Sequence, residues 1–448
     1  MPTMYRSTDP GAPPMDGVPG SMINVLDGCL VHGYGALATG VLTSDNNNVA
    51  NGDTVTIGSI TYTFKTTITG AAYDVLIGAN ADGSLLNLLQ AINFSGSLGT
   101  TYSNATTGHP EVSAATVVTA HSFVVTAKRP GTLGNSVGTT KAATSLSWGS
   151  PTLTGGSVSK ASLGWTKDYT ALARGIYRAP AASGGSRCYL EVIDNTPDVS
   201  NGAIVARVLG METVTALGSG ITPSSGSGLF ANLVNETWLK SASQVAFPQR
   251  IWVLFGDDRT FYLFVQAGTV TSAYHMYAFG DHRSLVAGDV TKGFIWGHNT
   301  FATPATWSSG ELGGAQSPST MIGHYLQRNW SGVISNTLFG KAGDMGFRGI
   351  GSSSPAQFVG SLTIPHAPDG GLYLSPVYIF EGAAGAYTQR GVIRGLYHLL
   401  HPLTSFNDGD TFAGAGDLAG RNFMIMKFLN LSGGANGMIA VETTPWAA

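Results

Sequence analysis

Charged residues are scarce in this chain. Asp, Glu, Lys and Arg together make up 11% of the 448 residues, against roughly 25% in an average soluble domain. A monomeric enzyme usually keeps itself soluble with a mixed charged surface. A chain with so few charges must cover itself with small polar residues or bury much of its surface against neighbours. Subunits of large assemblies often do both.

Clusters of cations and long apolar runs are also missing. The formal net charge is −3, and Lys and Arg form no run. Because phosphate neutralisation needs clustered cations, we do not expect nucleic acid as the main partner. The apolar stretches are shorter than the ~20 residues that span a bilayer, and residues 1–17 lack the apolar segment of a signal peptide. We therefore expect that the chain does not insert into a membrane and is not exported through a signal peptide of its own.

Cysteine is nearly absent. Cys29 and Cys188 are the two cysteines, and they lie far apart in the sequence. Two such thiols do not form a disulfide framework. We interpret both as small buried hydrophobic residues.

Glycine and short β-type segments are what the chain has instead. Glycine accounts for 61 of 448 residues, about twice its usual share of ~7%, and most glycines lie between short runs of β-branched and aromatic residues. The hydrophobic fraction of 43% is enough for real cores. The pattern predicts a mainly β protein, with β-sandwich or barrel-like modules and a few short helices.

Changes in composition along the chain predict four parts. Residues 1–20, rich in Pro and Gly, read as an extended N-terminal arm that could pack on a neighbour. Residues 41–157 form an inserted β-rich module of α+β character, bounded by glycine-rich joints. The host β domain comprises residues 21–40 plus 160–270, because a module inserts most easily at an exposed tip whose ends are close. Residues 271–448 form a C-terminal β domain.

Two helices and two hairpins are predicted from local pattern. Residues 21–31 form a short amphipathic helix with Ser21 as its N-cap. Residues 82–92 form a second helix with Asp82 or Ser84 as cap, and its buried stripe is Leu85, Leu88, Leu89 and Ile92. Residues 51–65 and 250–265 are hairpins.

Histidines and aspartates in two places are candidates for chemistry. His398 and His401 have a spacing that suits two zinc ligands on a helix, but no third ligand lies near and Pro402 follows. We interpret them as core or surface histidines. A second group contains Asp257, Asp258, His275, Asp281, His282 and His298. Its aspartates follow predicted strands, twice within Phe-Gly-Asp, which favours Asx-turns; a metal or carboxylate-pair site is the alternative.

No motif of nucleophilic, phosphate-binding or metal chemistry is found in the sequence. A nucleophile elbow, a Walker loop, HExxH and CxxC are all missing. We therefore predict no catalytic residue, no cofactor-binding residue, no metal ligand and no cofactor. Tryptophans could stack on sugars if exposed, and we favour buried positions for them. They are Trp148, Trp165, Trp238, Trp252, Trp296, Trp307, Trp330 and Trp446.

Two sets of segments resemble known phage proteins. Residues 51–65, 75–78, the leucine-rich segment at 85–92, His109-Pro110 and residues 129–135 resemble a small module of tailed-bacteriophage virion proteins. Residues 5–13, 33–35, 164–167 and 409–416, with the Phe-Gly-Asp turns, resemble a family of phage virion structural proteins. In that family the Gly-Tyr-Gly segment runs directly into the Gly-Trp segment, which agrees with an insertion. The family implies no catalytic residues.

The resemblance implies a non-enzymatic structural component of a tailed-phage virion, assembled in the host cytoplasm. We expect several copies in the tail or baseplate, in contact with other virion proteins and with copies of itself. A capsid decoration protein is one alternative. A receptor-binding tail protein that recognises host surface glycan and a glycan depolymerase are the others.

Overall fold

The chain is mainly β, as predicted, with 45% of residues in strands and 12% in helices. The computed structural model describes residues 2–171, 173–180, 188–200, 203–221, 236–241, 250–266, 274–296, 299–300, 324–326, 328–332, 337–341, 372–381, 388–399, 406–429 and 435–446. His298, His401 and Trp307 lie outside them. The chain divides into two compact units. Unit 1 comprises Met1–Ser7, Met15–Gly17 and Leu163–Ala448, and unit 2 comprises Thr8–Pro14 and Val18–Ser162.

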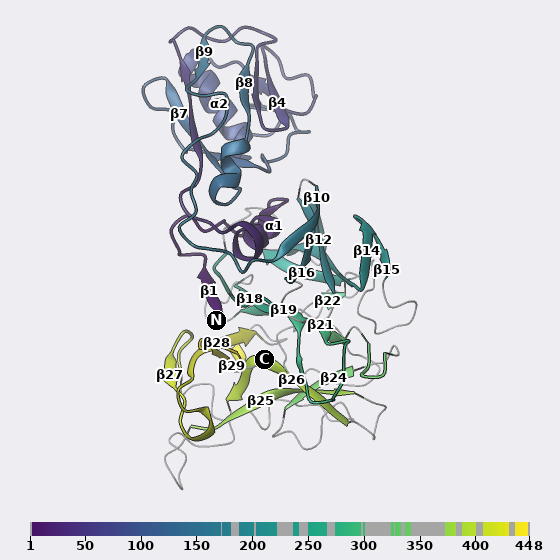
Figure 1. The fold of residues 1–448 in the computed structure, drawn as a ribbon. Helices are drawn as coiled ribbons and strands as arrows, with labels where there is room; N and C mark the ends of the chain where they lie inside the picture. The colour runs from purple at the N-terminus through teal and green to yellow at the C-terminus, as the bar shows by residue number, and fades with distance from the viewer. Residues whose placement is uncertain are drawn as a thin grey trace. The chain divides into compact units, whose positions relative to one another are not determined.

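Unit 1 is built around a sheet with the order β1-β17-β18-β19-β21-β23 (Figure 1). Every residue of β17, β18 and β19 is buried, so neither face of the sheet meets water along these three strands. The predicted hairpin at 250–265 is its centre and is confirmed. The strands are β1 (Thr3–Arg6), β17 (Trp252–Gly256), β18 (Thr260–Val265), β19 (His275–Asp281), β21 (Gly293–Trp296) and β23 (His324–Leu326).

A second sheet covers one face of this middle sheet, in the order β10-β11-β12-β13-β16-β22. Trp238 of this sheet stacks on Tyr277 and meets Phe261 edge-on, at ring-centroid distances of 5.3 and 6.2 Å. Its strands are β10 (Thr166–Ala171), β11 (Arg174–Arg178), β12 (Tyr189–Ser200), β13 (Ala203–Met211), β16 (Glu236–Ser241) and β22 (Asn299–Thr300). A separate hairpin joins β14 (Thr213–Ala216) and β15 (Ser219–Ile221).

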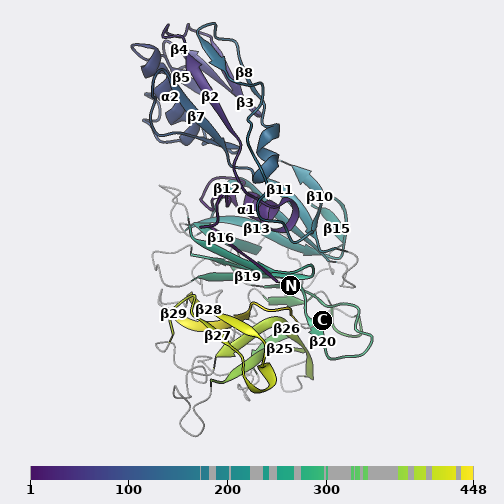
Figure 2. The same ribbon diagram turned by 60° about the vertical axis from the view of Figure 1, so that its left-hand side comes forward.

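The third sheet covers the other face, in the order β24-β25-β26-β29-β28-β27, and Figure 2 shows the three layers from a second side. One core cluster joins Phe264 and Met276 of the middle sheet to Ile393, Met426 and others of the third. The elements are β24 (Thr337–Lys341), β25 (Leu374–Glu381), β26 (Thr388–Leu399), β27 (Thr411–Ala413), the 3-10 turn η6 (Gly416–Leu418), β28 (Asn422–Leu429) and β29 (Ala435–Glu442). The short β20 (Arg283–Ser284) pairs with β26.

Unit 2 contains two four-stranded sheets and a helix around one core. The orders are β6-β7-β2-β9 and β5-β4-β3-β8, and only β4 and β5 pair in parallel among these described strands. The predicted hairpin at 51–65 is confirmed as β3 and β4. The strands are β2 (Thr39–Ser44), β3 (Thr54–Ile57), β4 (Ile60–Lys65), β5 (Asp74–Leu76), β6 (Val112–Ala114), β7 (Ser122–Ala127), β8 (Thr139–Lys141) and β9 (Leu146–Trp148).

The longest described helix, α2 (Ala81–Asn93), buries the predicted stripe of Leu85, Leu88, Leu89 and Ile92. Its predicted caps were wrong, because the side chain of Asn80 accepts the N–H of Gly83 and so caps the helix. Ser84 instead donates to Asn48 at 2.6 Å. A 3-10 turn, η2 (Gly131–Ser136), follows β7.

The first predicted helix is present with nearly the predicted bounds, but its second half is π-helical and it is buried on all sides in its first ten residues. It comprises α1 (Ser21–Leu26), all of whose residues are buried, and a π-helical turn, η1 (Asp27–His32). Ser21 is not the cap. Gly20 occupies the N-cap with a φ of 88°, a conformation that favours glycine, and no side chain caps the helix.

The segments that lead into and out of residues 41–157 run side by side. Backbone hydrogen bonds join Tyr34 to Lys160 in both directions, at 3.0 and 2.8 Å, and join Thr39 to Thr154 at 2.8 and 2.9 Å. The closeness of these ends is what an insertion requires.

The observed units differ from the four predicted parts. Residues 21–40 belong to unit 2, together with the predicted module. The predicted boundary at 270/271 lies between β18 and β19, which pair directly in one sheet. Of the predicted arm, β1 pairs with β17 of the same chain, and residues 8–14 belong to unit 2. The four-part organisation itself stays a prediction.

One glycine decides how closely β18 and β19 approach. Gly280 stands opposite Thr260 with a φ of +142°, and a Cβ there would lie 2.2 Å from the carbonyl oxygen of Arg259. We predict that Gly280→Ala lowers the free energy of unfolding of unit 1 by roughly 3 kcal/mol or more. Chemical denaturation measures this loss.

Gly288 provides the matched control. It also has a positive φ, +76°, but a Cβ added to it would meet no heavy atom within 4 Å. Gly288→Ala should cost only about 1–2 kcal/mol. Equal losses for the two variants would contradict the close-approach explanation.

Candidate functional site

Three ion pairs of unit 1 are buried on both sides. Arg390 pairs with Asp289, Arg394 with Asp257, and Lys240 with Asp194, and the side chains are at most 9% exposed. A buried ion needs a partner and further hydrogen bonds, because removal from water costs several kcal/mol per ion. These pairs are therefore the places where the interior of unit 1 depends on charge.

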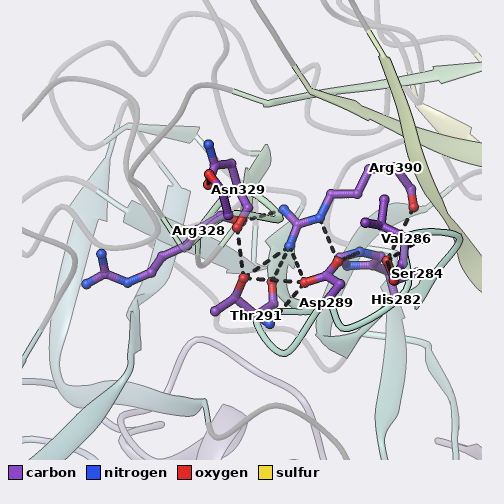
Figure 3. Close-up of polar contacts among 9 residues, drawn as sticks. His282, Ser284, Val286, Asp289, Thr291, Arg328, Asn329 and Arg390 are labelled. Carbon is purple, nitrogen blue, oxygen red and sulfur yellow. Dashed lines mark hydrogen bonds and ion pairs between the residues drawn. The ribbon is translucent and has the colours of Figure 1, made fainter.

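The Arg390–Asp289 pair lies at the centre of a larger polar network (Figure 3). Arg390 binds the carboxylate in a bidentate manner, with Nε–Oδ2 at 2.9 Å and Nη2–Oδ1 at 3.0 Å. It also donates to the carbonyl oxygens of Thr291, at 2.5 Å, and Arg328. The carboxylate further accepts the N–H of Thr291 at 3.1 Å. One guanidinium thus fastens β26 to the segments around residues 289 and 328.

Burial opposes ionisation of Asp289, but its partners outweigh this effect. Burial alone would raise the pKa of Asp289, while hydrogen bonds from Arg390 and Ser284 hold the pKa below its ordinary value. His282 lies beside this carboxylate, with Nε2 at 3.8 Å from Oδ2. Burial and the neighbouring Arg390 lower the pKa of His282 to about 3, so its ring is neutral at pH 7.

Asp257 has two roles. Its Oδ1 accepts the N–H groups of Arg259 and Thr260, each at 2.9 Å, which is the predicted Asx-turn. Its Oδ2 also lies 2.8 Å from Nη2 of Arg394. The hydroxyl of Tyr262 donates to the carbonyl oxygen of Arg394 at 2.5 Å. The β17–β18 turn is therefore fastened to β26 in the third sheet.

The other predicted site residues take structural positions. The turn prediction for Asp281 was wrong, because Asp281 is the last residue of β19 and its backbone N–H is bound by the hydroxyl of Thr260 at 3.1 Å. His275 is buried in the same strand, where burial lowers its pKa to about 4. His398 lies in β26, so the helical spacing considered for His398 and His401 does not occur there.

The aromatic and thiol predictions are confirmed for most of the side chains that the structure describes. Trp165, Trp238, Trp252 and Trp446 are buried, as are both cysteines. Trp148 is half-buried, and Trp330 is 55% exposed. For Trp296 the strand is described but the side chain is not. The indole of Trp165 donates to the carbonyl oxygen of Asp257 at 2.9 Å.

Unit 2 has a deeply buried polar centre of its own, His109. Its Nε2 lies 3.0 Å from the carbonyl oxygen of Ile57, and its Nδ1 accepts the N–H groups of Glu111 and Val112 at 3.1 and 3.2 Å. The ring therefore bridges β3 to the start of β6. Burial lowers the pKa of His109 to about 4, which keeps the ring neutral.

A clasp at the incoming and outgoing segments completes unit 2. Oδ2 of Asp9 accepts the hydroxyl of Tyr34 at 2.6 Å and Nζ of Lys160 at 2.8 Å. Asn135 clasps the outgoing segment in the same region, since it donates to and accepts from the backbone of Gly156 at 3.0 and 2.9 Å.

These arrangements hold segments together, and those of unit 1 keep their ionised groups away from solvent. Arg390, Asp289 and His282 are all buried. Within the described part of the chain, no group of three or more His, Cys, Asp or Glu side chains could hold a metal ion. No helix there is long and apolar enough to cross a bilayer.

Comparison with known proteins adds no family to this description. A scan against protein-family models finds no match to the chain, and a search of curated proteins finds none either.

Sequence reasoning missed the buried ion pairs. Arg390 and Asp289 are 101 residues apart, and Arg394 and Asp257 are 137 apart. One signal was present: Arg390 and Arg394 flank the apolar Val392 and Ile393 in a segment that reads as a strand, and cations in a buried strand require buried anions.

Removal of the central guanidinium should be costly. We predict that Arg390→Met lowers the free energy of unfolding of unit 1 by about 3–5 kcal/mol, because Asp289 is left buried without its cation. The control is Arg178→Met, whose partner Asp168 is 24% exposed and whose loss should cost about 0–1 kcal/mol. Urea denaturation measures both losses. Similar destabilisation by the two variants would contradict a special role for the Arg390–Asp289 pair.

Unit 2 should lose stability as the pH falls from about 6.5 to about 4. Unfolded His109 takes up a proton near its ordinary pKa, whereas the folded form resists until about pH 4. The unfolded state binds more protons in this window, so the free energy of unfolding falls by up to about 1.4 kcal/mol per pH unit. His109→Gln should flatten this slope, measured by hydrogen exchange of unit 2 peptides.

The control for this variant is His121→Gln, at a partly exposed side chain. An unchanged slope in His109→Gln, or an equal change in His121→Gln, would show that His109 is not the source of the acid sensitivity.

Proposed function

We propose that this protein is a non-enzymatic structural subunit of a tailed-phage virion, present in several copies, with the tail or baseplate as its first expected place. The observation that carries the proposal is where the phage-like segments lie. They supply contacts that hold each of the two units together internally.

The module-like segments supply the frame of unit 2. Residues 51–65 form the β3–β4 hairpin, and His109 bridges β3 to β6. Asn135, at the end of residues 129–135, clasps the outgoing segment at Gly156. Such positions specify an architecture, so a resemblance there bears on fold and assembly.

The second set of phage-like segments, which includes residues 33–35, 164–167 and 409–416, also lies at internal contacts. A Cβ on Gly35 would lie 2.6 Å from the backbone of the outgoing segment. Trp165 packs edge-on against Phe261 at 5.5 Å in the middle sheet, and Phe412 stacks on Phe423 at 5.4 Å. These motifs again lie at points of close packing.

The scarcity of charge is consistent with an assembly role. Three of the ion pairs of unit 1 are buried on both sides, and the chain has few charges to begin with. A subunit that buries much of its surface against neighbours needs few charges, and obligate interfaces are large and apolar.

The rival functions have weaker support in the described residues. A glycan-binding tail protein would favour a row of exposed aromatic rings, yet among the aromatic side chains that the structure describes only Trp330 and Tyr373 are exposed. A depolymerase would favour a long β-helix of parallel strands, whereas one pair of described strands, β4 and β5, is parallel.

The location of the chain in purified particles tests the proposal. Mass spectrometry of density-purified virions should detect the chain, and cryo-electron microscopy should place several symmetry-related copies in the tail or baseplate. Absence from the particle would overturn the proposal. Density on the capsid surface would support the decoration alternative, and polysaccharide cleavage by the purified protein would overturn the non-enzymatic role.

A further inference from the structure

We infer that the outward face of the β6-β7-β2-β9 sheet in unit 2 is an interface with a second copy of this chain. The inference rests on the proposed function, in which the chain works in several copies, and it names the surface through which two copies meet. The structure describes the four strands and the loops around them throughout.

The two faces of this sheet have different chemistry. Leu42, Phe123, Val125 and Leu146 point inward and belong to the core of unit 2. The residues that alternate with inward ones point outward, and all are Ser, Thr or Val. They are Thr39, Val41, Thr43, Ser113, Ser122, Val124, Thr126 and Ser147.

Val41 and Val124 form the centre of this outward face. They are directly opposed across β2 and β7, and they are 42% and 39% exposed. The pairs Thr39 with Thr126 and Thr43 with Ser122 flank them. The centre of the face is therefore an apolar cross-strand pair, flanked on both sides by small hydroxyl side chains.

Charges lie at the two ends of the face and not on it. Asp45 follows β2 and is exposed. At the same end, Asp82 binds His121, which precedes β7, at 2.8 Å. Lys128 and Arg129 follow β7 at the opposite end.

The basic end is partly occupied. Nζ of Lys128 donates to the carbonyl oxygen of His109 at 3.0 Å, and Glu111 lies 3.8 Å from Arg129 and offsets part of its charge. The face is therefore neutral in the middle, negative at one end and positive at the other.

This distribution matches a copy of itself. In a two-fold interface, each side presents the same patch to the other. If the axis passes through the centre of the face at Val124, lies in the interface plane and runs perpendicular to the strands, the acidic end of one copy faces the basic end of the other. Val124 then faces Val124 of the second copy across the axis. Nucleic acid would instead need clustered cations along the face.

Charge exchange at Val124 tests this geometry in the full-length protein. Sedimentation equilibrium should show that the wild type self-associates. Val124→Lys and Val124→Glu should each weaken association at least about 100-fold, because like charges then face each other. An equimolar mixture of the two variants should recover association. Thr61→Lys, on the outward side of β4 in the other sheet, is the control and should leave association unchanged.

Three results would overturn the inference: a monomeric wild type, variants that associate like the wild type, or a mixture that fails to recover. Thermal unfolding of each variant checks its fold. If either Val124 variant misfolds, Val41→Lys and Val41→Glu place the same charges on the same axis, because Val41 is directly opposed to Val124 and is 42% exposed.

The failure of this interface can be distinguished from failure of the proposed function. If virions contain several copies of the chain while the wild type stays monomeric in solution, this interface is wrong and the function stands. If the chain associates through Val124 but is absent from virions, the structural role in the particle is wrong.

Discussion

Three strands of the middle sheet of unit 1 have no face toward water, and the layered arrangement of that unit follows from this constraint. Strands β17, β18 and β19 are buried along their full length. A sheet of this kind needs a covering layer on each side, which the second and third sheets supply. Burial of both faces also removes the positions where charged side chains are normally found, in keeping with the low charge content.

The same constraint explains why the ion pairs matter. Turns at the ends of a buried sheet contain polar groups that water cannot reach, so the protein must satisfy them itself. Asp257 does this for the β17–β18 turn, and Asp289 does it for the segment after β20. Both carboxylates are neutralised by arginines of β26. A single strand of the third sheet therefore fixes two turns of its neighbours.

Local features could be predicted from the sequence, and distant ones could not. Both hairpins and the leucine stripe of α2 depend on residues close together in the sequence, so the spacing of apolar residues along the chain predicts them. The cap of α2 was missed by two residues because Asn80, Asp82 and Ser84 are all plausible caps. The turn predicted at Asp281 was wrong because its Phe-Gly-Asp matches that of Asp257, although Gly280 and Asp281 lie inside β19. The arginine partners of Asp257 and Asp289 are more than 100 residues away, and no local pattern identifies them.

The pairing of β1 with β17 has a consequence for synthesis on the ribosome. Thr3 is opposed to Gly256, so the first strand waits for its partner while the intervening chain is made. At ~5–20 residues per second, this delay is roughly 13–50 s. Residues 18–162 form a nearly continuous unit and can fold during that interval. For that time the partner strand of residues 3–6 does not yet exist in their own chain.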